Sequence, residues 1–409
     1  MEPNVDYLDA KAWDGAMRER MRWLRENEPV YWSGKSGLWV VSKFDDVCHV
    51  SKNHKIFCSG FGVRPGNPVK LGLIDEDEPR HTKLRRLINR GFTPRMVKKL
   101  EGVFREITTE AIDQIASKGE CDVVEDIAVP LPLLLIAEMI GIRKEDRERF
   151  HHWSDRMIAA EGNMEEPEIV AAASQAFMEY SAYVTAIIED RRAKPQDDLV
   201  SILVGAKDEG ILKTFENSHS PRRGDDEEYV ALANDELIKL LVILLVAGNE
   251  TTRNGISGSI QLLIEHPEAR EELRKDPSLI PMAVEEMLRL VSPVHSFSRT
   301  ATCDTEIKGK KIEKGQSVLM LYPSANRDAD EFEDPETFDI RRNPHHVAFG
   351  IGNHFCMGAN LARMELRVAL EEVLRRLPDM EYTAGGPELV PSPLVRTCKH
   401  MQVKFTAEG

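Results

Sequence analysis

The sequence predicts a mainly α-helical protein with a few small β-sheets, folded as a single large domain. Apolar residues recur at helical spacing along most of the chain, and β-type stretches lie mainly at about 28–60 and 300–325. No internal repeat and no clean linker divides the 409 residues. A hydrophobic content of 42% is ample for a core of this size, and 30% charged residues suit a surface in water.

The elements are expected in the following order. A helix over 11–26 precedes a hairpin in PVYWSGKSGLWVVSKF, where GKSG has the composition of a turn. Amphipathic patterns then predict helices over 79–91, 94–117, 130–140, 143–159, 168–193 and 197–206. The polar stretch 207–233 is expected to form a surface loop. A long helix from near Asp235 to His266 is followed by helices at 267–274 and 278–290, a small sheet in 300–322, a helix over 359–377 and a last hairpin.

The composition argues against several classes of protein. A formal net charge of −15 disfavours a general nucleic-acid-binding protein, which must neutralise phosphates. The N-terminal residues MEPNVDYLDAKAWDG lack an export signal, and the longest apolar run, LIKLLVILLVAG (237–248), is too short to span a bilayer and contains a lysine. We therefore expect a cytoplasmic protein with no membrane anchor, in which this run is a buried helix.

Six cysteines are scattered through the chain, at positions 48, 58, 121, 303, 356 and 398, with no Cys-x-x-Cys pair. Five of them are expected to be reduced, small buried hydrophobic residues. Cys356 differs because it lies in FGIGNHFCMG (349–358), between glycines and immediately before a predicted helix.

The surroundings of Cys356 favour its thiolate form. Unpaired N–H groups and the positive end of the following helix stabilise an anionic sulfur, and Gly350 and Gly352 would let the loop bring further amides to it. This arrangement fits a sulfur that holds a metal. A nucleophilic cysteine remains an alternative, although it needs a base and an oxyanion site that nothing nearby clearly supplies. A tight structural turn is the third interpretation.

The segment AGNETT (247–252) places a carboxylate and hydroxyls inside the long apolar helix. An unpaired charge buried there would cost several kcal/mol, so Glu250 and Thr251 are candidates for a proton-delivery pair beside a pocket. The structural alternative is a helix kink at which Thr251 bonds a backbone carbonyl.

Further charged pairs recur at helical spacing. Glu286 and Arg289 lie three residues apart, and His81 and Arg85 lie one turn apart. Such residues usually form a solvated face. Together with Arg299 and His354, however, His81 and Arg85 could neutralise two carboxylates of a buried cofactor.

These motifs resemble those of the cytochrome P450 superfamily, in its soluble bacterial class. The haem signature Phe-Gly-x-Gly-x-His-x-Cys-x-Gly is complete at Phe349, Gly350, Gly352, His354, Cys356 and Gly358. The oxygen-activation motif is matched by Ala247, Gly248, Glu250 and Thr251, the Glu-x-x-Arg motif by Glu286 and Arg289, and the His-x-x-x-Arg motif by His81 and Arg85, before GFTP. SANRD (324–328) and FDIRR (338–342) also resemble family segments. Two departures are Glu250, where many bacterial members have Asp, and a longer polar insert around 213–229.

The resemblance implies a cytochrome P450 fold that encloses haem b (iron protoporphyrin IX), with O2 as co-substrate. Cys356 would be the axial iron ligand, shielded by Phe349 and supported by the Gly350 loop, with Ala247 and Gly248 against the cofactor. The haem propionates would be bound by His81, Arg85, Arg299 and His354. Glu250 and Thr251 would deliver protons for dioxygen activation. Glu286 and Arg289, with Arg341 or Arg342, would form a structural ion-pair network.

The implied activity is a monooxygenase that inserts one oxygen atom into a hydrophobic small molecule. Family positions suggest substrate contacts at Val63, Leu73, Val246, Ala247, Val294, Phe297 and Val395, although core packing explains each of them about as well. GFGVRPGNP and LIDEDEP resemble members that oxidise steroid side chains and branched lipids, which favours a steroid, sterol or fatty-acid-like substrate. A terpenoid or polyketide hydroxylase and a peroxide-driven haem-thiolate enzyme are the alternatives.

The resemblance also implies partners. The chain has no flavin or iron–sulfur module, so electrons would come from an NAD(P)H reductase through a separate ferredoxin or flavodoxin. The protein is expected to be a monomer. A haem sensor or electron carrier is the competing class, but it would be expected to have an effector domain or a small domain with an exposed haem edge, and the sequence indicates neither. A basic docking patch is predicted, with a plain solvated face as the alternative, from Arg80, Arg86, Arg90, Lys98, Lys99, Arg363 and Arg367.

Overall fold

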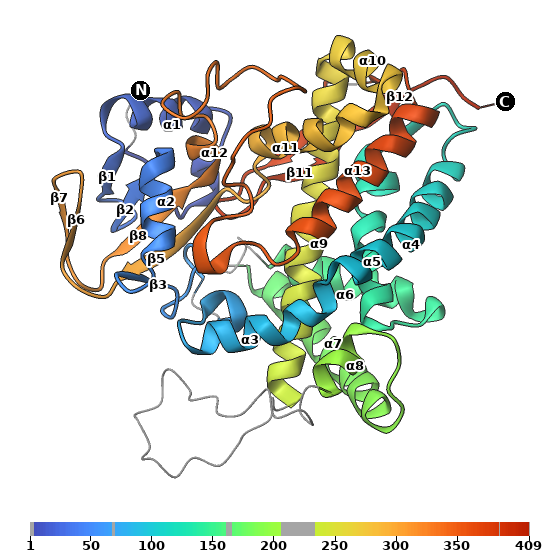
Figure 1. Ribbon diagram of the computed structural model, residues 1–409, viewed down its shortest axis with the longest axis horizontal. Coiled ribbons are helices and arrows are strands. Elements are labelled where there is room, and N and C mark those ends of the chain that lie inside the picture. Colours follow the sequence, from blue (N-terminus) through green and yellow to red (C-terminus); the bar gives the residue numbers. More distant parts are fainter. Residues whose placement is uncertain (1–3, 68–69, 161–165, 206–233, 384, 409) are drawn as a thin grey trace. The chain divides into compact units, whose positions relative to one another are not determined.

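The computed structural model describes residues 4–67, 70–160, 166–205, 234–383 and 385–408 (Figure 1). They form two compact units, each described separately below. Unit 1 comprises Met1–Pro68, Lys99–Pro132 and Glu250–Gly409, and unit 2 comprises Val69–Lys98 and Leu133–Asn249. The predicted polar insert at 207–233 lies outside the described residues. The long helix α9 (Asn234–Glu265) contributes its first part to unit 2 and its second part, from Glu250, to unit 1.

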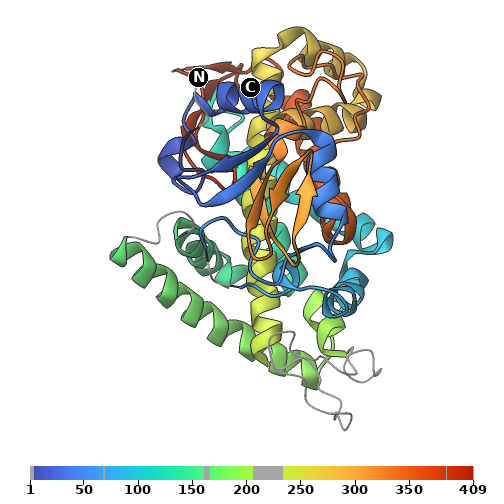
Figure 2. The ribbon, with the colours of Figure 1, turned by 90° about the vertical axis from the view of Figure 1, so that its left-hand side faces the viewer.

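Unit 1 contains a five-stranded sheet in the order β1-β2-β8-β5-β3 (Figure 2). The strands are β1 (Val30–Ser33), β2 (Leu38–Val41), β8 (Ser317–Leu321), β5 (Ser296–Ala301) and β3 (Phe57–Cys58). β1 and β2 form the predicted hairpin, whose turn includes Gly37 at φ +64°. β2 pairs parallel to β8, and the other pairings are antiparallel.

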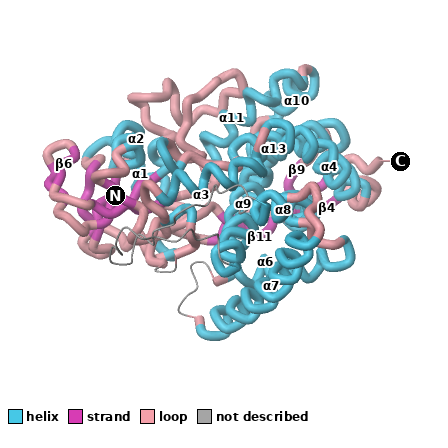
Figure 3. The backbone as a smooth tube through the Cα atoms, turned by 60° about the horizontal axis from the view of Figure 1, so that its bottom comes forward, coloured by secondary structure: helices cyan, strands magenta, loops and turns pink. Residues whose placement is uncertain are grey.

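Alternation along the strands gives this sheet two buried faces. Val40 and Leu319 pack in one hydrophobic cluster with residues of α1 (Met17–Asn27). Their neighbours Val41 and Val318 pack in another with residues of α2 (Phe44–Lys52). Successive side chains of a strand point to opposite faces, so a continuous apolar run such as LWVV is what a sheet covered on both sides requires. In Figure 3 these strands gather beside α1 and α2.

The rest of unit 1 combines helices with small sheets. Its helices include α10 (Pro267–Lys275), α11 (Ile280–Val291), α12 (Tyr322–Ala325), α13 (Ala359–Arg376) and all but the first turn of α4 (Pro94–Asp113). α11 packs against α13. The small sheets pair β6 (Thr305–Ile307) with β7 (Lys310–Ile312), β10 (Glu388–Val390) with β11 (Thr397–His400), and β12 (Gln402–Lys404) with β4 (Glu120–Asp122) and β9 (Glu381–Tyr382).

Unit 2 is helical, with α3 (Arg80–Ile88), most of α5 (Pro130–Ile140), α6 (Arg147–Ala159), α7 (Pro167–Ala193), α8 (Leu199–Gly205) and the first part of α9. Trp153 of α6 and Tyr180 of α7 meet edge to face, and the Tyr180 hydroxyl donates to the Leu241 carbonyl of α9 at 3.2 Å. The apolar run 237–248 is therefore a packed helix, as predicted. No described helix is long and apolar enough to cross a membrane.

Three predictions need correction. The helix expected over 94–117 ends at Asp113, and the chain turns before β4, which the sequence analysis missed. The tail is more than a hairpin, because β12 leaves β11 to pair with β4 and β9. Cys303 is exposed and not a buried hydrophobic residue, whereas Cys48, Cys58, Cys121 and Cys398 are buried as expected.

Candidate active site

The Cys356 loop is followed by the predicted helix. A single turn (Gly352–His354) precedes the cysteine, and α13 begins at Ala359. Gly350 and Gly352 have φ values of +67° and +78°, a region that favours glycine. The Cys356 N–H donates to the Phe349 carbonyl at 2.8 Å and closes the loop. Cys356 is an exposed residue of unit 1, unlike the four buried cysteines.

The position of Gly352 also has a packing reason. A Cβ at this residue would lie 2.9 Å from the Ser51 carbonyl oxygen and 3.4 Å from the Lys52 Cα atom, at the end of α2. The loop therefore rests directly on the backbone of α2, and only glycine permits this approach.

Aromatic and charged groups support the loop from α11 and α13. The Phe349 ring lies 6.3 Å from the Phe355 ring, and the Arg363 guanidinium lies over Phe349 at 4.6 Å. Arg363 is held by Glu285 through two hydrogen bonds of 2.7 and 2.8 Å, and His346 lies 3.3 Å from the same carboxylate. Burial acts to raise the pKa of Glu285, but the hydrogen bonds of His346 and Arg363 outweigh it and lower this pKa to about 2.

The four predicted propionate-binding residues divide between the units. In unit 1, His354 Nε2 lies 3.1 Å from Ser59 Oγ, just after β3, and β3 pairs Cys58 with Thr300, the residue after Arg299. In unit 2, His81 and Arg85 share one face of α3. Arg299 and His81 are 5% and 2% exposed. His81 Nδ1 lies 3.4 Å from Glu78 Oε1, and Arg299 Nη1 donates to the Ser298 carbonyl at 2.8 Å. Burial alone therefore does not establish a propionate-binding role.

The Glu250 carboxylate is buried in unit 1 and is held by its own helix. Arg253 Nη2 lies 2.8 Å from Oε2, Asn254 Nδ2 donates to Oε1 at 2.9 Å, and Thr397 Oγ1 lies 3.5 Å from Oε1. Burial raises the pKa of Glu250, and Arg253 opposes the rise. The Arg253 ion pair compensates the buried charge, so burial alone does not establish a catalytic role.

The neighbouring residues of the same motif belong to unit 2. Gly248 approaches α5 closely, since a Cβ there would lie 3.0 Å from Ile136 Cδ1. The buried Asn249 side chain donates to Ser154 Oγ of α6 at 3.0 Å. Gly248 thus has a packing role that is independent of any cofactor.

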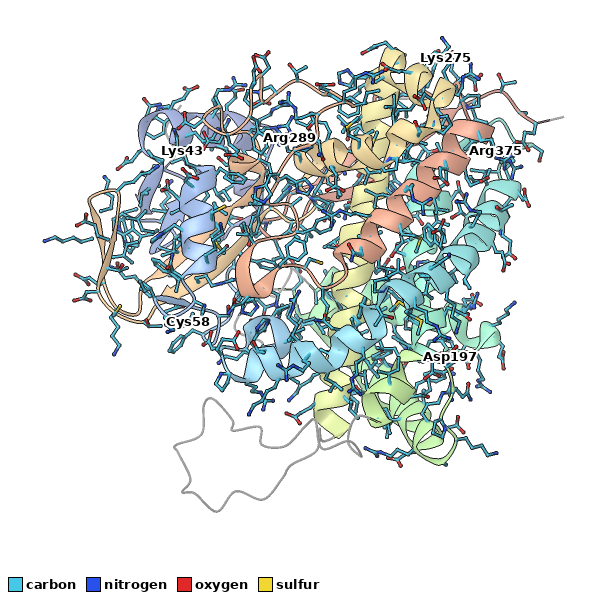
Figure 4. All side chains as sticks on the ribbon, viewed as in Figure 1. Lys43, Cys58, Asp197, Lys275, Arg289 and Arg375 are labelled. Carbon is cyan, nitrogen blue, oxygen red and sulfur yellow. The ribbon has the colours of Figure 1, made fainter. Side chains whose placement is uncertain are left out.

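Glu286 and Arg289 form a fully buried ion pair on α11. Figure 4 labels Arg289 among the side chains. Arg289 Nε donates to Glu286 Oε2 at 2.6 Å, and its Nη1 donates to the Asn326 and Pro335 carbonyls at 2.7 Å each. Of the two predicted partners, Arg342 is the one that contacts Glu286, at 3.2 Å, while Arg341 pairs with Glu272 at the surface.

The predicted substrate positions form two groups. In unit 1, Val294 and Val395 form a β-bridge, and the Val63 carbonyl accepts from the N–H of Ser298, next to Phe297. These four residues therefore lie on connected backbone. In unit 2, the predicted positions are Leu73, Val246 and Ala247, of which Leu73 is buried and Ala247 is exposed.

The predicted basic patch is only partly available. Arg367 pairs with Glu101 at 2.8 Å and with Glu371 at 2.9 Å, Arg363 is engaged by Glu285, and Arg80 pairs with Glu76 at 3.1 Å. Arg86 and Lys98 are exposed in unit 2.

Sequence reasoning missed the partners of Glu250. Arg253 was detectable, because it is a second charged residue one turn further along an apolar helix. Thr397 was not, because no pattern connects it to a residue 147 positions earlier.

The donor set suits an iron porphyrin. Cys356 is an exposed cysteine three residues before α13, and an iron porphyrin needs only an axial ligand from the chain, together with cations for its carboxylates. Within unit 1, Arg299 is buried and His354 is half-buried; within unit 2, His81 is buried and Arg85 is half-buried.

Comparisons with known proteins agree with this interpretation. The sequence pattern of the family described as "Cytochrome P450" matches residues 166–405, more than half of the chain. A steroid C26-monooxygenase of Mycobacterium tuberculosis is 37% identical over 99% of this chain and 98% of its own length. The polyketide biosynthesis cytochrome P450 PksS of Bacillus subtilis is 34% identical over 90% of this chain and 89% of its own length.

A solved structure supports the same assignment. The chain superposes on CYP109E1 of Bacillus megaterium in complex with testosterone with a TM-score of 0.82, at 32% identity, over 95% of this chain and 99% of that one. The family implies haem iron and the use of O2. The chain therefore belongs to the cytochrome P450 family of monooxygenases.

Proposed function

We propose that this P450 monooxygenase inserts one oxygen atom of O2 into a steroid, a sterol side chain or a fatty-acid-like lipid. The observation that carries the proposal is the 37% identity with a steroid C26-monooxygenase over 99% of the chain. The apolar character of Val63, Val294, Phe297 and Val395 is consistent with a hydrophobic ligand.

We assign the cofactor as haem b, held by Cys356 through its sulfur and by His81, Arg85, Arg299 and His354 through their charges. When bound, the haem iron supplies dioxygen activation and oxygen transfer. The amides of the Gly350–Gly352 loop stabilise the anionic sulfur, and Phe349 excludes water from it.

Glu250 holds the proton that the reaction requires. Its burial raises its pKa, which favours the protonated form, and Arg253 limits that rise. Thr251, the next residue on α9, passes the proton on. Transfer of this kind contributes typically about 10²–10⁴ in rate.

The substrate assignment is tested by a binding screen. Steroids, fatty acids and terpenoids are titrated into the haem-loaded protein, and the spin-state change of the haem spectrum is recorded. A steroid or long-chain lipid is expected to bind most tightly and to give a hydroxylated product with NAD(P)H, a reductase and a ferredoxin. Tight binding of terpenoids alone would overturn the steroid and lipid assignment.

The second candidate is a polyketide or terpenoid hydroxylase, favoured by the 34% identity with PksS. The same binding screen separates this candidate from the steroid or lipid hydroxylase if polyketide fragments are included among the ligands.

A peroxide-driven enzyme is a third candidate. For the proposed monooxygenase, Thr251→Ala should lower product formed per NAD(P)H with electron donors and leave peroxide-supported turnover nearly unchanged. Wild-type turnover with peroxide, together with no turnover when NAD(P)H and the electron donors are supplied instead, would favour the third candidate.

We further propose that a ferredoxin or flavodoxin docks near the exposed cations of α3 and α4. Arg86→Glu should slow reduction, more strongly at low salt, because charge steers such encounters. Lys311→Glu, an equal charge change on the exposed β6–β7 hairpin, is the control. Arg367 is unsuitable for this test because its ion pairs with Glu101 and Glu371 also stabilise the fold. Equal reduction rates of the two variants would contradict the proposal.

A further inference from the structure

Glu285 of α11 and Arg363 of α13 form a charged pair next to the cysteine loop (349–358). Arg363 Nε and Nη2 donate to the two carboxylate oxygens at 2.7 and 2.8 Å, a bidentate geometry that fixes the guanidinium in one orientation. The adjacent carboxylate, Glu286, is directed at Arg289 instead. α11 therefore presents two consecutive carboxylates to two different arginines, and of these two pairs only the second is fully buried.

His346 holds the Glu285 carboxylate from the segment that leads into the loop. Its Nδ1 atom accepts from the Ala348 N–H at 3.1 Å, so its ring proton is on Nε2, which lies 3.3 Å from Glu285. Burial acts to raise the pKa of Glu285, but His346 and Arg363 lower it to about 2, so this carboxylate is charged at neutral pH. The network thus holds one negative and one positive charge in fixed positions.

The positive member of the pair is the one that contacts the loop. The Arg363 guanidinium lies over the Phe349 ring at 4.6 Å, an arrangement in which a cation is attracted to the aromatic face. The Phe355 ring meets Phe349 edge to face at 6.3 Å, and the Cys356 N–H donates to the Phe349 carbonyl at 2.8 Å. Arg363 therefore touches the residue to which the cysteine is hydrogen-bonded.

The Cys356 sulfur and the Arg363 side chain lie at the same end of α13. A Cβ at Gly358 would be 4.0 Å from Cys356 Sγ, so the sulfur lies close to the residue before the helix. Arg363 is one turn after Ala359, about 6 Å further along the axis, and helical side chains lean towards the N-terminus. A charge at this range in a partly exposed site changes an equilibrium that creates a second charge by about threefold or more.

We propose that Arg363, fixed by Glu285 and His346, is a positioning residue that raises the reduction potential of the haem, a role that depends on the proposed ligation of the haem by Cys356. One-electron reduction adds a negative charge beside the anionic sulfur, and a nearby cation favours it. Glu285 opposes this effect through its own charge while it holds the guanidinium over Phe349. Loss of the positive charge and loss of the negative charge should therefore act in opposite directions.

The test measures the equilibrium reduction potential of the substrate-free, haem-loaded protein, by titration with dithionite and redox dyes and without a protein partner. Arg363→Met should lower the equilibrium constant for one-electron reduction at least about threefold, a shift of about 28 mV. Glu285→Gln, which has nearly the same shape as the native side chain, should raise it by a similar factor. The double variant Glu285→Gln/Arg363→Met should lie between the two single variants. A role limited to folding would instead shift both single variants in the same direction, because each would loosen the same loop.

A second ion pair in unit 1 provides matched controls. On α10, Arg274 donates to Glu271 through two hydrogen bonds of 2.7 and 2.8 Å, in an exposed position. Arg274→Met and Glu271→Gln should each change the reduction constant less than about 1.5-fold. Arg363→Lys keeps a cation at the Phe349 ring and should stay within about twofold of the wild type.

Three results would overturn the proposal. They are shifts of the same sign in Arg363→Met and Glu285→Gln, shifts no larger than those of the α10 controls, and a potential of Arg363→Lys as low as that of Arg363→Met. If Arg363→Met takes up no haem, Glu285→Gln decides alone, and an unchanged or lowered reduction constant overturns the proposal. Absence of a thiolate-type spectrum from the reduced carbon monoxide complex of the wild type would instead count against haem ligation by Cys356.

Discussion

Replacing Arg253 by methionine tests how the buried Glu250 carboxylate is stabilised. The variant removes the 2.8 Å ion pair and leaves the carboxylate with Asn254 and the distant Thr397 hydroxyl. Breaking a buried pair in this way costs about 3–5 kcal/mol if the remaining group stays charged. Glu250 can avoid part of this cost by taking up a proton.

The free energy needed to protonate Glu250 limits how far Arg253→Met can destabilise the folded state. From an ordinary pKa of about 4.3, protonation costs about 3.7 kcal/mol at pH 7 and about 1 kcal/mol at pH 5, since one pKa unit corresponds to about 1.36 kcal/mol. Burial already raises the pKa of Glu250 above its unfolded value, so the folded state binds the proton more tightly and stability falls as pH rises through this window. Arg253→Met raises this pKa further. Its destabilisation should therefore reach about 2–4 kcal/mol at pH 7 and shrink to about 1 kcal/mol at pH 5.

Urea unfolding at both pH values, followed by fluorescence and haem absorbance, measures this difference. The double variant Glu250→Gln/Arg253→Met should recover most of the loss at pH 7, because it leaves no buried charge. A loss that is equal at pH 5 and pH 7, or a double variant no more stable than Arg253→Met, would refute the reasoning.

Three further predictions use unfolding free energies. Arg289→Lys should lower the free energy of unfolding by about 3 kcal/mol or more, because lysine cannot reach both Glu286 and the backbone carbonyls. The control Arg274→Lys, in an exposed ion pair, should lower it by less than about 0.5 kcal/mol. Similar losses in the two variants would contradict the structural role of Arg289. Gly352→Ala should cost at least about 2 kcal/mol through its positive φ and the clash with α2. Gly358→Ala should cost under about 1 kcal/mol, because Gly358 has φ −81° and its Cβ would only make an ordinary 4.0 Å contact with Cys356 Sγ. The reverse order would show that the loop is placed differently. Thr397→Val should cost under about 1 kcal/mol, since its 3.5 Å contact is long, and a larger loss would mean that Thr397 holds Glu250 more closely.

Local patterns predicted most of the fold, because helix periodicity and turn composition are properties of neighbouring residues. The β1–β2 hairpin and the start of α13 after Cys356 are examples. Features that depend on distant segments were missed. The three residues of β4 gain their strand conformation from β12, about 280 positions later, and no periodicity in so short a segment indicates that pairing.

The candidate site shows the same division between local and distant information. The i,i+3 spacing predicted the Glu286–Arg289 pair, but the choice of Arg342 over Arg341 required the path of the chain after Pro335. Likewise, the charges of Arg363 and Arg367 were visible in the sequence, whereas their carboxylate partners on α11 and α4 were not. A basic patch read from sequence alone therefore overstates the charge available to a partner.

Several residues of the family motifs are required by the fold for reasons separate from catalysis. Gly352 lets the cysteine loop rest on α2, Gly248 lets α9 approach α5, and Glu286 with Arg289 ties α11 to the segment before the loop. These residues would therefore be needed for folding even in a relative that does not activate oxygen. Cys356 differs, because it is an exposed residue and a serine of nearly the same shape would keep the loop's backbone geometry. The thiol itself is therefore the residue on which the catalytic interpretation depends, and Cys356→Ser should leave the apoprotein folded while abolishing the thiolate-type spectrum of the reduced carbon monoxide complex.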